Sequence, residues 1–578
     1  MTVAPNPRFS TRYGDVTHTK ASGATYTPTA LADFVADEML RTWRAPRGRT
    51  IRLMDPAVGE GALLLSLLHR LPPELTVEVH GFDSDSVALE IARRALADAH
   101  PRALLHLRAG DFLTTVLHGP ATPDGDLFAL NPSTTYDLVI ANPPYVRTQI
   151  MGAHNAQRLA AQFGLRGRVD LYYAFLLGIA RTLRADGVAG VITSNRFMTT
   201  RSGASVRRAI QERFHLRHVW DLGDTKLFNA AVLPAVLIAQ GLHDEPSCPT
   251  GFSSIYETKE TNTASVPSVI AALAHSGVIA VPDGRRFHVQ HGVLDVSNPT
   301  GDDAGVWRVA TAQSDSWLAT VTRHTWAPFA RIGKVRVGVK TCADKVFIGR
   351  AWASLPDEER PELLRPLTTH HVARRFRADP CTPPYAIIYP HEVVAGKRQA
   401  VDLTAYPKSV RFLAQHRAAL EARSYVAAAG RQWYELWVPQ DPAAWAKPKL
   451  VFRDISEEPC FWLDLEGSVV NGDCYWLACD AGVPDDLLWL AASVGNSTFI
   501  EAFYDHRFNN KLYAGRRRFI TQYVENFPLP DPQSTTARAI IALAKQVYAC
   551  TDAAESAALQ TEGNRLVWSA FGLPIEER

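Results

Sequence analysis

The stretch Asp137-Leu138-Val139-Ile140-Ala141-Asn142-Pro143-Pro144-Tyr145 predicts a buried strand and the polar turn that follows it. Its apolar residues suit a short strand inside a sheet. The two prolines fix φ twice and remove two backbone donors, so a directly following helix cannot use the carbonyl oxygens of Asn142 and Pro143. With the Asn142 side-chain oxygen, these carbonyls can accept hydrogen bonds from an amino group, and Tyr145 adds a flat apolar face. The turn therefore suits a planar ring that carries an exocyclic NH2 group.

The tetrapeptide Asn142-Pro143-Pro144-Tyr145 resembles the (Asn/Asp/Ser)-Pro-Pro-(Tyr/Phe) signature of amino-methyltransferases that use S-adenosylmethionine. Its Asn-Pro-Pro-Tyr form is similar to that of the DNA adenine-N6 enzymes. The resemblance implies that all four residues are catalytic. Glutamine-N5 and some RNA guanine-N2 methyltransferases share the signature. A proline-rich turn after a buried strand is the structural alternative.

Length and composition predict several folded domains. A chain of 578 residues exceeds one ordinary domain, and about 150 residues per domain suggests two to four of them. Hydrophobic residues make up 46% and charged residues 21%, so disorder is not expected. The net charge of +2 does not by itself indicate nucleic acid, and any basic DNA-binding track must be local.

The cysteines and the apolar runs predict a cytoplasmic protein. Seven cysteines without a Cys-x-x-Cys pair are most simply reduced thiols. No histidine pair lies near Cys474 and Cys479 in the sequence, so no metal site is predicted. The sequence has no uncharged apolar run of about 18 residues, so neither secretion nor membrane spanning is expected.

Acidic residues follow three further predicted strands. Ile51 to Met54 leads into Asp55-Pro56-Ala57-Val58-Gly59-Glu60-Gly61, whose glycines let the backbone pass close to a ligand. This pattern favours adenosylmethionine over a pyrophosphate. The strand Thr76 to Phe82 ends in Asp83, which can accept both ribose hydroxyls. The strand Leu105 to Ala109 leads to Asp111, which can accept from the adenine amine, and to Phe112, which can pack on the adenine ring.

Ligands of open α/β sheets lie at the carboxyl edge of the strands, where these acids gather. The predicted cofactor-binding residues in this region are Asp55, Ala57, Gly59, Asp83, Asp111 and Phe112.

A helix is predicted after Gly23-Ala24-Thr25-Tyr26-Thr27-Pro28, with Thr27 as its N-cap and Pro28 as its first residue. The N-terminus of a helix can hold a carboxylate such as that of the methionine part of the cofactor. An ordinary capped helix is the alternative. Its position before the first strand resembles the cofactor element of adenine methyltransferases whose target domain follows the catalytic domain. Thr25, Tyr26 and Thr27 are therefore predicted cofactor-binding residues.

Strands and helices alternate from about residue 23 to 241, which predicts a doubly wound, Rossmann-like sheet. The last strand, 232–238, contains Pro234 and is predicted to lie at an edge. Phe228 matches a phenylalanine that lies edge-on to the flipped base in the resembled family, which makes it a predicted catalytic residue. Ala231 stands where some members carry a basic residue.

The second half of the sequence lacks the regular alternation of strands and helices. Residues 243–300 are rich in Ser, Thr, Pro and Gly and predict a connector with some short strands, and residues 301–535 resemble an α+β target-recognition domain of restriction–modification systems. Residues 1–22 are predicted as an arm and 536–578 as a helical segment. Basic residues among aromatics can contact phosphates and base edges. The predicted DNA-binding residues are Arg336, Lys340, Lys511, Arg516, Arg517 and Arg518. The run 516–518 could equally be a solvated surface.

The order of these motifs predicts an α/β methyltransferase domain at 23–242 followed by the α+β target-recognition domain. The resemblance implies transfer of a methyl group from S-adenosylmethionine to N6 of a flipped-out adenine in duplex DNA, as the protective enzyme of a restriction system. Its implied partners are double-stranded DNA and a separately acting restriction endonuclease, with the chain as a monomer or weak dimer. The alternatives are a glutamine-N5 or RNA methyltransferase, and a DNA-binding specificity subunit whose methyltransferase half is inactive.

Overall fold

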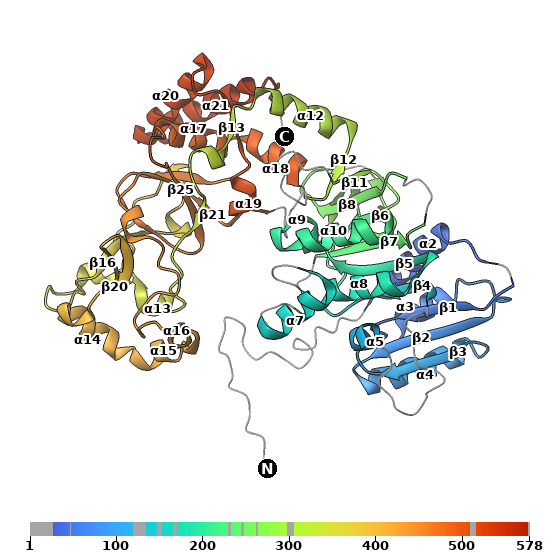
Figure 1. Ribbon diagram of the computed structural model, residues 1–578. Helices are drawn as coiled ribbons and strands as arrows, with labels where there is room; N and C mark the ends of the chain where they lie inside the picture. Colours follow the sequence, from blue (N-terminus) through green and yellow to red (C-terminus); the bar gives the residue numbers. More distant parts are fainter. Residues whose placement is uncertain are drawn as a thin grey trace, which may run out of the picture. The chain divides into compact units, whose positions relative to one another are not determined.

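The computed structural model describes residues 27–46, 48–118, 135–146, 153–165, 170–228, 233–243, 248–261, 264–296, 306–508 and 516–575. They form two compact units (Figure 1). The first unit contains the described residues up to Thr311, and the second contains those from Ala312 onward.

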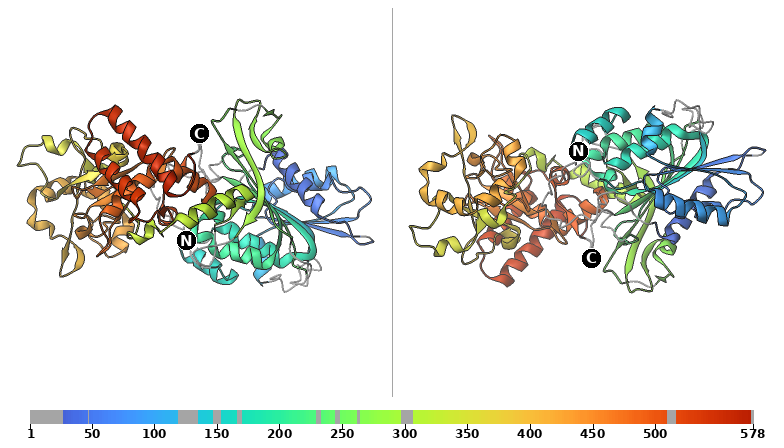
Figure 2. Two further views of the ribbon diagram at one scale, coloured as in Figure 1. Left: turned by 90° about the horizontal axis from the view of Figure 1, so that it is seen from above. Right: turned by 90° about the horizontal axis from the view of Figure 1, so that it is seen from below.

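The first unit combines one large sheet with helices on both of its faces (Figure 2). Its helices are α2 (Thr29–Thr42), α3 (Ala62–Leu68), α4 (Ser86–Ala99), α5 (Phe112–His118), α7 (Ala153–Phe163), α8 (Leu171–Thr182), α9 (Arg196–Thr199), η1 (Arg201–Gly203), α10 (Ala204–Arg213) and α11 (Val269–Ala272). Its strands are β1 (Ile51–Asp55), β2 (Val77–Asp83), β3 (Leu104–Ala109), β4 (Tyr136–Ala141), β5 (Leu183–Ser194), β6 (His215–Asp221), β7 (Pro234–Gln240), β8 (Gly251–Glu257), β9 (Ala264–Ser265), β10 (Gly277–Ala280), β11 (Arg286–Asp295) and β12 (Arg308–Ala310).

Twelve of the described strands form this sheet, and its first part runs in the order β3-β2-β1-β4-β5-β7-β6. Neighbours from β3 to β5 are parallel, whereas β7 is antiparallel to both β5 and β6. One core cluster joins the sheet to α2, α3 and α4, and a second joins its other face to α5, α8 and α10. The α/β doubly wound prediction is confirmed. Asp55, Asp83 and Asn142 lie at or just beyond the carboxyl ends of parallel strands β1, β2 and β4.

The prediction that the strand with Pro234 lies at an edge is wrong, because β7 lies between β5 and β6. Pro234 is its first residue and is paired in register with Ser194. Proline is tolerated at the first position of a strand, where its missing N–H interrupts no ladder. The Pro234 carbonyl also accepts from the Leu222 N–H at 2.9 Å.

The predicted connector at 243–300 is also corrected, because its strands belong to the large sheet of the first unit and do not form a separate link. β8 pairs in parallel with β6, and β11 pairs antiparallel with β8. Ser253 and Ser254 are buried in β8, and the Ser253 hydroxyl lies 2.8 Å from His218 Nε2 and 2.7 Å from His291 Nδ1. The serine content of this region thus includes hydrogen-bonded strand residues. β12 pairs with β11, so the first unit extends to Thr311.

The second unit contains shorter elements. Its helices are α12 (Ala312–His324), η2 (Phe329–Arg331), α13 (Asp344–Phe347), η3 (Ala351–Ser354), η4 (His370–Val372), η5 (Leu403–Ala405), α14 (Pro407–Gln415), α15 (Arg417–Glu421), α16 (Ser424–Ala428), η6 (Pro442–Ala444), α17 (Asp486–Gly495), α18 (Thr498–Phe508), α19 (Thr521–Val524), α20 (Thr535–Ala549) and α21 (Ala553–Ala570). Its strands are β13 (Ala327–Pro328), β14 (Arg336–Val337), β15 (Ile348–Gly349), β16 (Leu364–Thr368), β17 (Phe376–Arg377), β18 (Ala386–Ile388), β19 (His391–Val394), β20 (Lys397–Ala400), β21 (Lys449–Arg453), β22 (Ile455–Ser456), β23 (Phe461–Asp464), β24 (Val469–Val470), β25 (Cys474–Ala478), β26 (Arg517–Arg518) and β27 (Pro528–Leu529).

The second unit is built on a five-stranded sheet, β14-β25-β21-β23-β17, and a four-stranded sheet, β15-β18-β16-β24. Trp445, Trp462 and Trp476 are buried in its core. Residues 536–578, expected as a separate segment, include α20 and α21, which pack on each other and on α17 within this unit. Within the described residues, no helix has both the length and the apolar character needed to cross a membrane.

Candidate active site

The turn after β4 holds the side chain of Asn142 from two sides. β4 is completely buried, and Asn142 follows it directly as a half-buried residue. Asn142 Nδ2 donates to the Thr27 hydroxyl oxygen at 3.0 Å. The Tyr145 hydroxyl donates to Asn142 Oδ1 at 2.7 Å. The carboxamide therefore has one orientation in this structure, with its nitrogen toward Thr27 and its oxygen toward Tyr145.

The structure corrects the predicted start of the first helix. The N-cap of α2 is Pro28, and no side chain caps it. Because the helix begins at Thr29, Thr27 lies two residues before it and its hydroxyl accepts from Asn142 instead. Thr25 and Tyr26 lie outside the described residues.

Asp55, the last residue of β1, is completely buried. Its Oδ1 accepts from the Ala57 N–H at 2.9 Å, whereas its Oδ2 has no hydrogen-bond partner among the described residues. Burial raises the pKa of Asp55 to about 8; the Ala57 hydrogen bond opposes this shift and the nearby Asp83 adds to it. A buried carboxylate is costly unless it is paired. The unpartnered oxygen thus leaves room for a cation or donor supplied by a ligand.

The loops after β1 and β2 are joined at Asp83. Its Oδ2 accepts from the Gly59 N–H at 2.7 Å and its Oδ1 accepts from the Asp85 N–H at 2.8 Å. Gly59 has a φ of +53°, and a Cβ built there would meet no atom within 4 Å. The positive φ favours glycine at this position. The open space beside it is what a cofactor site needs.

Asp111 and Phe112 lie next to each other at the start of α5. Asp111 is exposed, and its carboxylate accepts from the Leu113 N–H at 3.0 Å and from the Thr114 hydroxyl at 2.9 Å at the start of α5. The Phe112 side chain is only 1% exposed and lies between Phe82 and Phe175, with ring centroids 5.7 and 5.8 Å away. The prediction that Phe112 packs on a cofactor ring is corrected, because α5 turns this residue into the core.

The two predicted aromatic partners of a flipped base lie in different parts of the core. Phe228 is 6% exposed and belongs to the cluster around Trp220 and Leu222 on the α2 face. Tyr145 packs at the border of the other cluster, with its ring edge-on to Tyr172 at 6.2 Å. Phe228 and Tyr145 have no ring contact with each other in the described part of the chain. Ala231 lies outside the described residues.

A buried polar network near the same sheet edge was not predicted. Asp221, at the end of β6, accepts from Asn195 Nδ2 at 2.8 Å, from the Tyr256 hydroxyl at 2.6 Å and from the Gly223 N–H at 3.1 Å. Burial raises the pKa of Asp221 to about 6 despite these donors. A polar residue at the end of a predicted strand was the available signal, since the same signal identified Asp55 and Asp83.

The predicted DNA-binding residues of the second unit lie in different environments. Arg336 is half-buried, with its guanidinium 5.4 Å from the Trp476 ring centroid. Lys340 and Arg516 are exposed. Lys511 lies outside the described residues.

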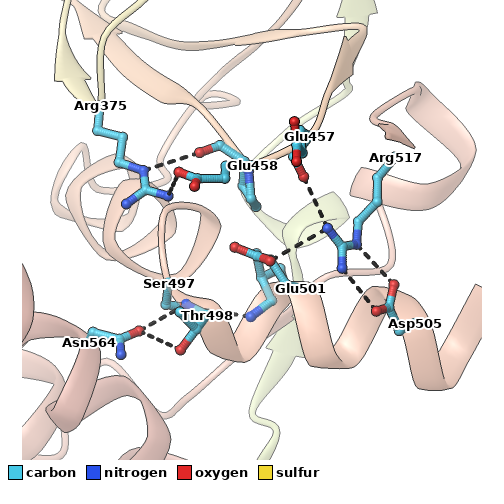
Figure 3. Close-up of polar contacts among 11 residues, drawn as sticks. Arg375, Glu457, Glu458, Ser497, Thr498, Glu501, Asp505, Arg517 and Asn564 are labelled. Carbon is cyan, nitrogen blue, oxygen red and sulfur yellow. Dashed lines mark hydrogen bonds and ion pairs between the residues drawn. The ribbon is translucent and has the colours of Figure 1, made fainter. Parts of the chain in front are cut away.

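The prediction that Arg517 contacts DNA is corrected, because this residue forms a buried ion pair (Figure 3). Its side chain is 8% exposed and donates to both carboxylate oxygens of Asp505 at 2.9 Å. Glu501 Oε2 lies 3.4 Å from it, and the Glu457 carbonyl accepts from it at 3.0 Å. Arg518 is 44% exposed and pairs with Asp454 at 3.1 Å. The short strand β26 therefore points adjacent arginines in different directions, one inward and one outward.

Within the described ranges, no group of three or more His, Cys, Asp or Glu residues could hold a metal ion. The seven cysteines all fall in those ranges and are free thiols.

Comparison with known proteins identifies the family. The family model described as Eco57I restriction-modification methylase matches residues 78–228. The type II methyltransferase M.BanIII of Aneurinibacillus aneurinilyticus is 37% identical over 91% of this chain and 93% of its own length. M.PaeR7I of Pseudomonas aeruginosa, also a type II methyltransferase, is 25% identical over 97% of this chain and 93% of its own.

A solved structure extends the likeness to the fold. The DrdV–DNA complex has a TM-score of 0.51 and 12% identity, over 93% of this chain and 58% of that chain. At this identity the comparison concerns the fold alone. The near full-length match to M.BanIII carries the assignment and confirms the resemblance predicted from the Asn-Pro-Pro-Tyr turn: the chain belongs to the type II methyltransferases of restriction–modification systems.

Proposed function

We propose that this protein transfers a methyl group from S-adenosylmethionine to N6 of an adenine turned out of duplex DNA. The observation that carries this proposal is the Asn142 carboxamide, held at the carboxyl end of β4 by Thr27 and Tyr145. Its oxygen and the Pro143 carbonyl offer two acceptors to one amino group. The neighbouring strand β1 ends in Asp55, so the acceptors lie beside the proposed cofactor loop.

The residues at the ends of β1 and β2 suit the cofactor. The unpartnered oxygen of buried Asp55 fits a cationic ligand, and the open space beside Gly59 fits a close backbone approach. Asp83 would accept the ribose hydroxyls, and Asp111 the adenine amine. When bound, S-adenosylmethionine supplies an electrophilic methyl group, and its sulfur keeps the electron pair of the broken carbon–sulfur bond.

The chain's own contribution is to orient the target nitrogen. A paired adenine hides N6, so it must leave the duplex at a cost of about a few kcal/mol, and the Tyr145 ring would hold it by stacking. The N6 lone pair is delocalised into the base. Hydrogen bonds from N6 to Asn142 Oδ1 and the Pro143 carbonyl turn the nitrogen toward tetrahedral geometry and free the pair for attack. N6 then loses one proton to water. Positioning and fixed dipoles would supply the rate enhancement.

This activity is the protective half of a restriction system. The substrate is double-stranded DNA, and the partner in such a system is a restriction endonuclease that acts separately on unmethylated sites. We place site recognition in the second unit, where Arg336, Lys340, Arg516 and Arg518 are the proposed DNA contacts among the described residues. Family membership and the intact set of Asp55 and Asn142 favour this function over a glutamine-N5 or RNA methyltransferase and over an inactive specificity subunit.

The test is the identity of the methylated product. The protein is incubated with duplex DNA and methyl-labelled cofactor, and the DNA is digested to nucleosides. We expect the label in N6-methyladenine. Label in N4-methylcytosine, in RNA or only in protein would overturn the proposal.

A further inference from the structure

We propose that Thr27 is a positioning residue for Asn142: its hydroxyl turns the carboxamide so that the oxygen, and not the NH2 group, meets the target amine. This inference rests on the proposed function and concerns a contact that spans 115 positions of the chain. It replaces the sequence-based role of Thr27 as a cofactor-binding residue.

The orientation of a carboxamide matters because its two ends have opposite hydrogen-bonding character. The oxygen accepts and the NH2 group only donates. A target amine brings N–H donors, so a carboxamide rotated by half a turn would present a donor to a donor. The two ends look alike by shape, and both partners are hydroxyls, which can donate or accept, so the two donor–acceptor distances distinguish the ends. A device that fixes the orientation is therefore needed at this position.

The two hydrogen-bond distances fit this orientation of the carboxamide. The distance from Asn142 to Thr27, 3.0 Å, is typical of an N–H donor, and the distance from Tyr145 to Asn142, 2.7 Å, is typical of an O–H donor. Burial raises the pKa of Tyr145, so its hydroxyl keeps its proton and remains a donor.

Thr27 is held firmly enough to act in this way. It is 7% exposed, so water competes little for its oxygen. It directly precedes Pro28, whose carbonyl accepts from the N–H groups of Leu31 and Ala32 at 3.0 Å at the start of α2. Leu31 is completely buried against the sheet. The hydroxyl position is therefore set by helix packing.

Cofactor-binding and positioning roles predict different defects. If Thr27 binds the cofactor, removal of its hydroxyl raises the cofactor dissociation constant. If Thr27 orients Asn142, the dissociation constant stays within about threefold and turnover at saturation falls. A misplaced reacting group typically lowers the rate by about a hundredfold, so we expect a loss of about ten- to a hundredfold.

The experiment compares Thr27→Val, which keeps the shape and removes the hydroxyl, with Thr27→Ser, which restores it. Thr29→Val is the matched control, since Thr29 is exposed two residues away on α2. Cofactor binding is measured by calorimetry. The turnover number kcat is measured separately, with saturating DNA and cofactor. We expect Thr27→Val to lose turnover alone, and Thr27→Ser and Thr29→Val to stay within about threefold of the wild type. If thermal melting shows that Thr27→Val does not fold, cofactor binding and kcat are measured for Thr27→Ala instead and compared with those of Thr27→Ser.

A second readout does not depend on activity. Selective 15N-asparagine labelling, with Asn142→Ala for assignment, reports the solvent exchange of the Asn142 side-chain NH2 group. Loss of the Thr27 acceptor should speed this exchange at least about tenfold. Unchanged exchange together with unchanged kcat would overturn the inference, and so would a rise in the cofactor dissociation constant that matches the fall in turnover. Product identity in the wild type tests the proposed function separately, because both readouts at Thr27 remain valid whichever amino group is methylated.

Discussion

Asp55 in the first unit and Arg517 in the second are both buried ionisable residues, and both were predicted from the sequence to contact a ligand. They differ in how their charge is compensated. Arg517 has three acidic or carbonyl partners inside the protein, Asp505, Glu501 and Glu457 (Figure 3). Asp55 Oδ2 has no hydrogen-bond partner among the described residues. A buried charge that is fully paired serves the fold, while one left unpaired indicates a place for a ligand. Substitutions at the first site should change ligand binding or turnover, with or without a change in stability, and substitutions at the second should change stability alone.

The largest effect is expected from Asn142→Ala. Loss of the preorganised acceptor should lower kcat by about two to four powers of ten. The cofactor dissociation constant should change little, since the Asn142 side chain follows β4 and is held by Thr27 and Tyr145, whereas the proposed cofactor loops follow β1 and β2. Calorimetry and saturated turnover measure the two quantities. A loss of cofactor binding as large as the loss of turnover would show that Asn142 has a structural role. The first unit would then no longer differ from the second in what a substitution changes.

Arg517→Ala should act on stability. Removing one partner of a buried ion pair typically costs about 3–5 kcal/mol, and here the carboxylates of Asp505 and Glu501, each 15% exposed, lose the arginine that pairs with them. Denaturant unfolding of the full chain, followed by fluorescence, measures the change. Arg518→Ala is the matched control, since its 44% exposed pair with Asp454 should contribute at most about 1 kcal/mol. Equal effects of the two substitutions would contradict the ion-pair assignment.

Asp55→Asn should move binding and stability in opposite directions. The cofactor dissociation constant should rise by about tenfold or more, because the carboxylate that compensates a cation is gone. The pKa of Asp55 is raised to about 8 in the folded protein, so its stabilising contribution is full below the ordinary value near 3.8 and is lost as the pH rises to about 8. The asparagine variant should therefore be more stable than the wild type at pH 8 and similar at pH 4. Thermal melts at both pH values check this, and a variant less stable than wild type at pH 8 would contradict it.

The smallest effect is expected from the double substitution Arg516→Ala with Arg518→Ala. If these exposed side chains contact phosphates, affinity for cognate and scrambled duplexes should fall alike. The slope of log affinity against log salt should flatten by about 0.9 for each lost phosphate contact. Titrations at several salt concentrations measure it. Unchanged slopes and affinities would show that only other parts of the second unit contact DNA.

The strands that carry the site could be predicted because their signals are local. β1, β2 and β4 are apolar runs that end at a polar residue, and their observed bounds differ from the predicted ones by one or two residues. The place of β7 in the sheet could not be predicted, since strand order depends on pairing between distant segments. The serines of β8 were misinterpreted for a similar reason, because their hydroxyl partners, His218 and His291, come from other strands.

The sequence by itself determined the fold class and the position of Asn142, because the alternation of strands and helices and the stiffness of two prolines are properties of neighbouring residues. Only the tertiary structure decided which side chains are left open to a ligand. Phe112 faces the core because α5 packs on α8, and Arg517 is neutralised because α18 supplies Asp505. Thr27 meets Asn142 because α2 packs on β5, the neighbour of β4 in the sheet, and no local pattern indicates a contact between residues so far apart in the chain.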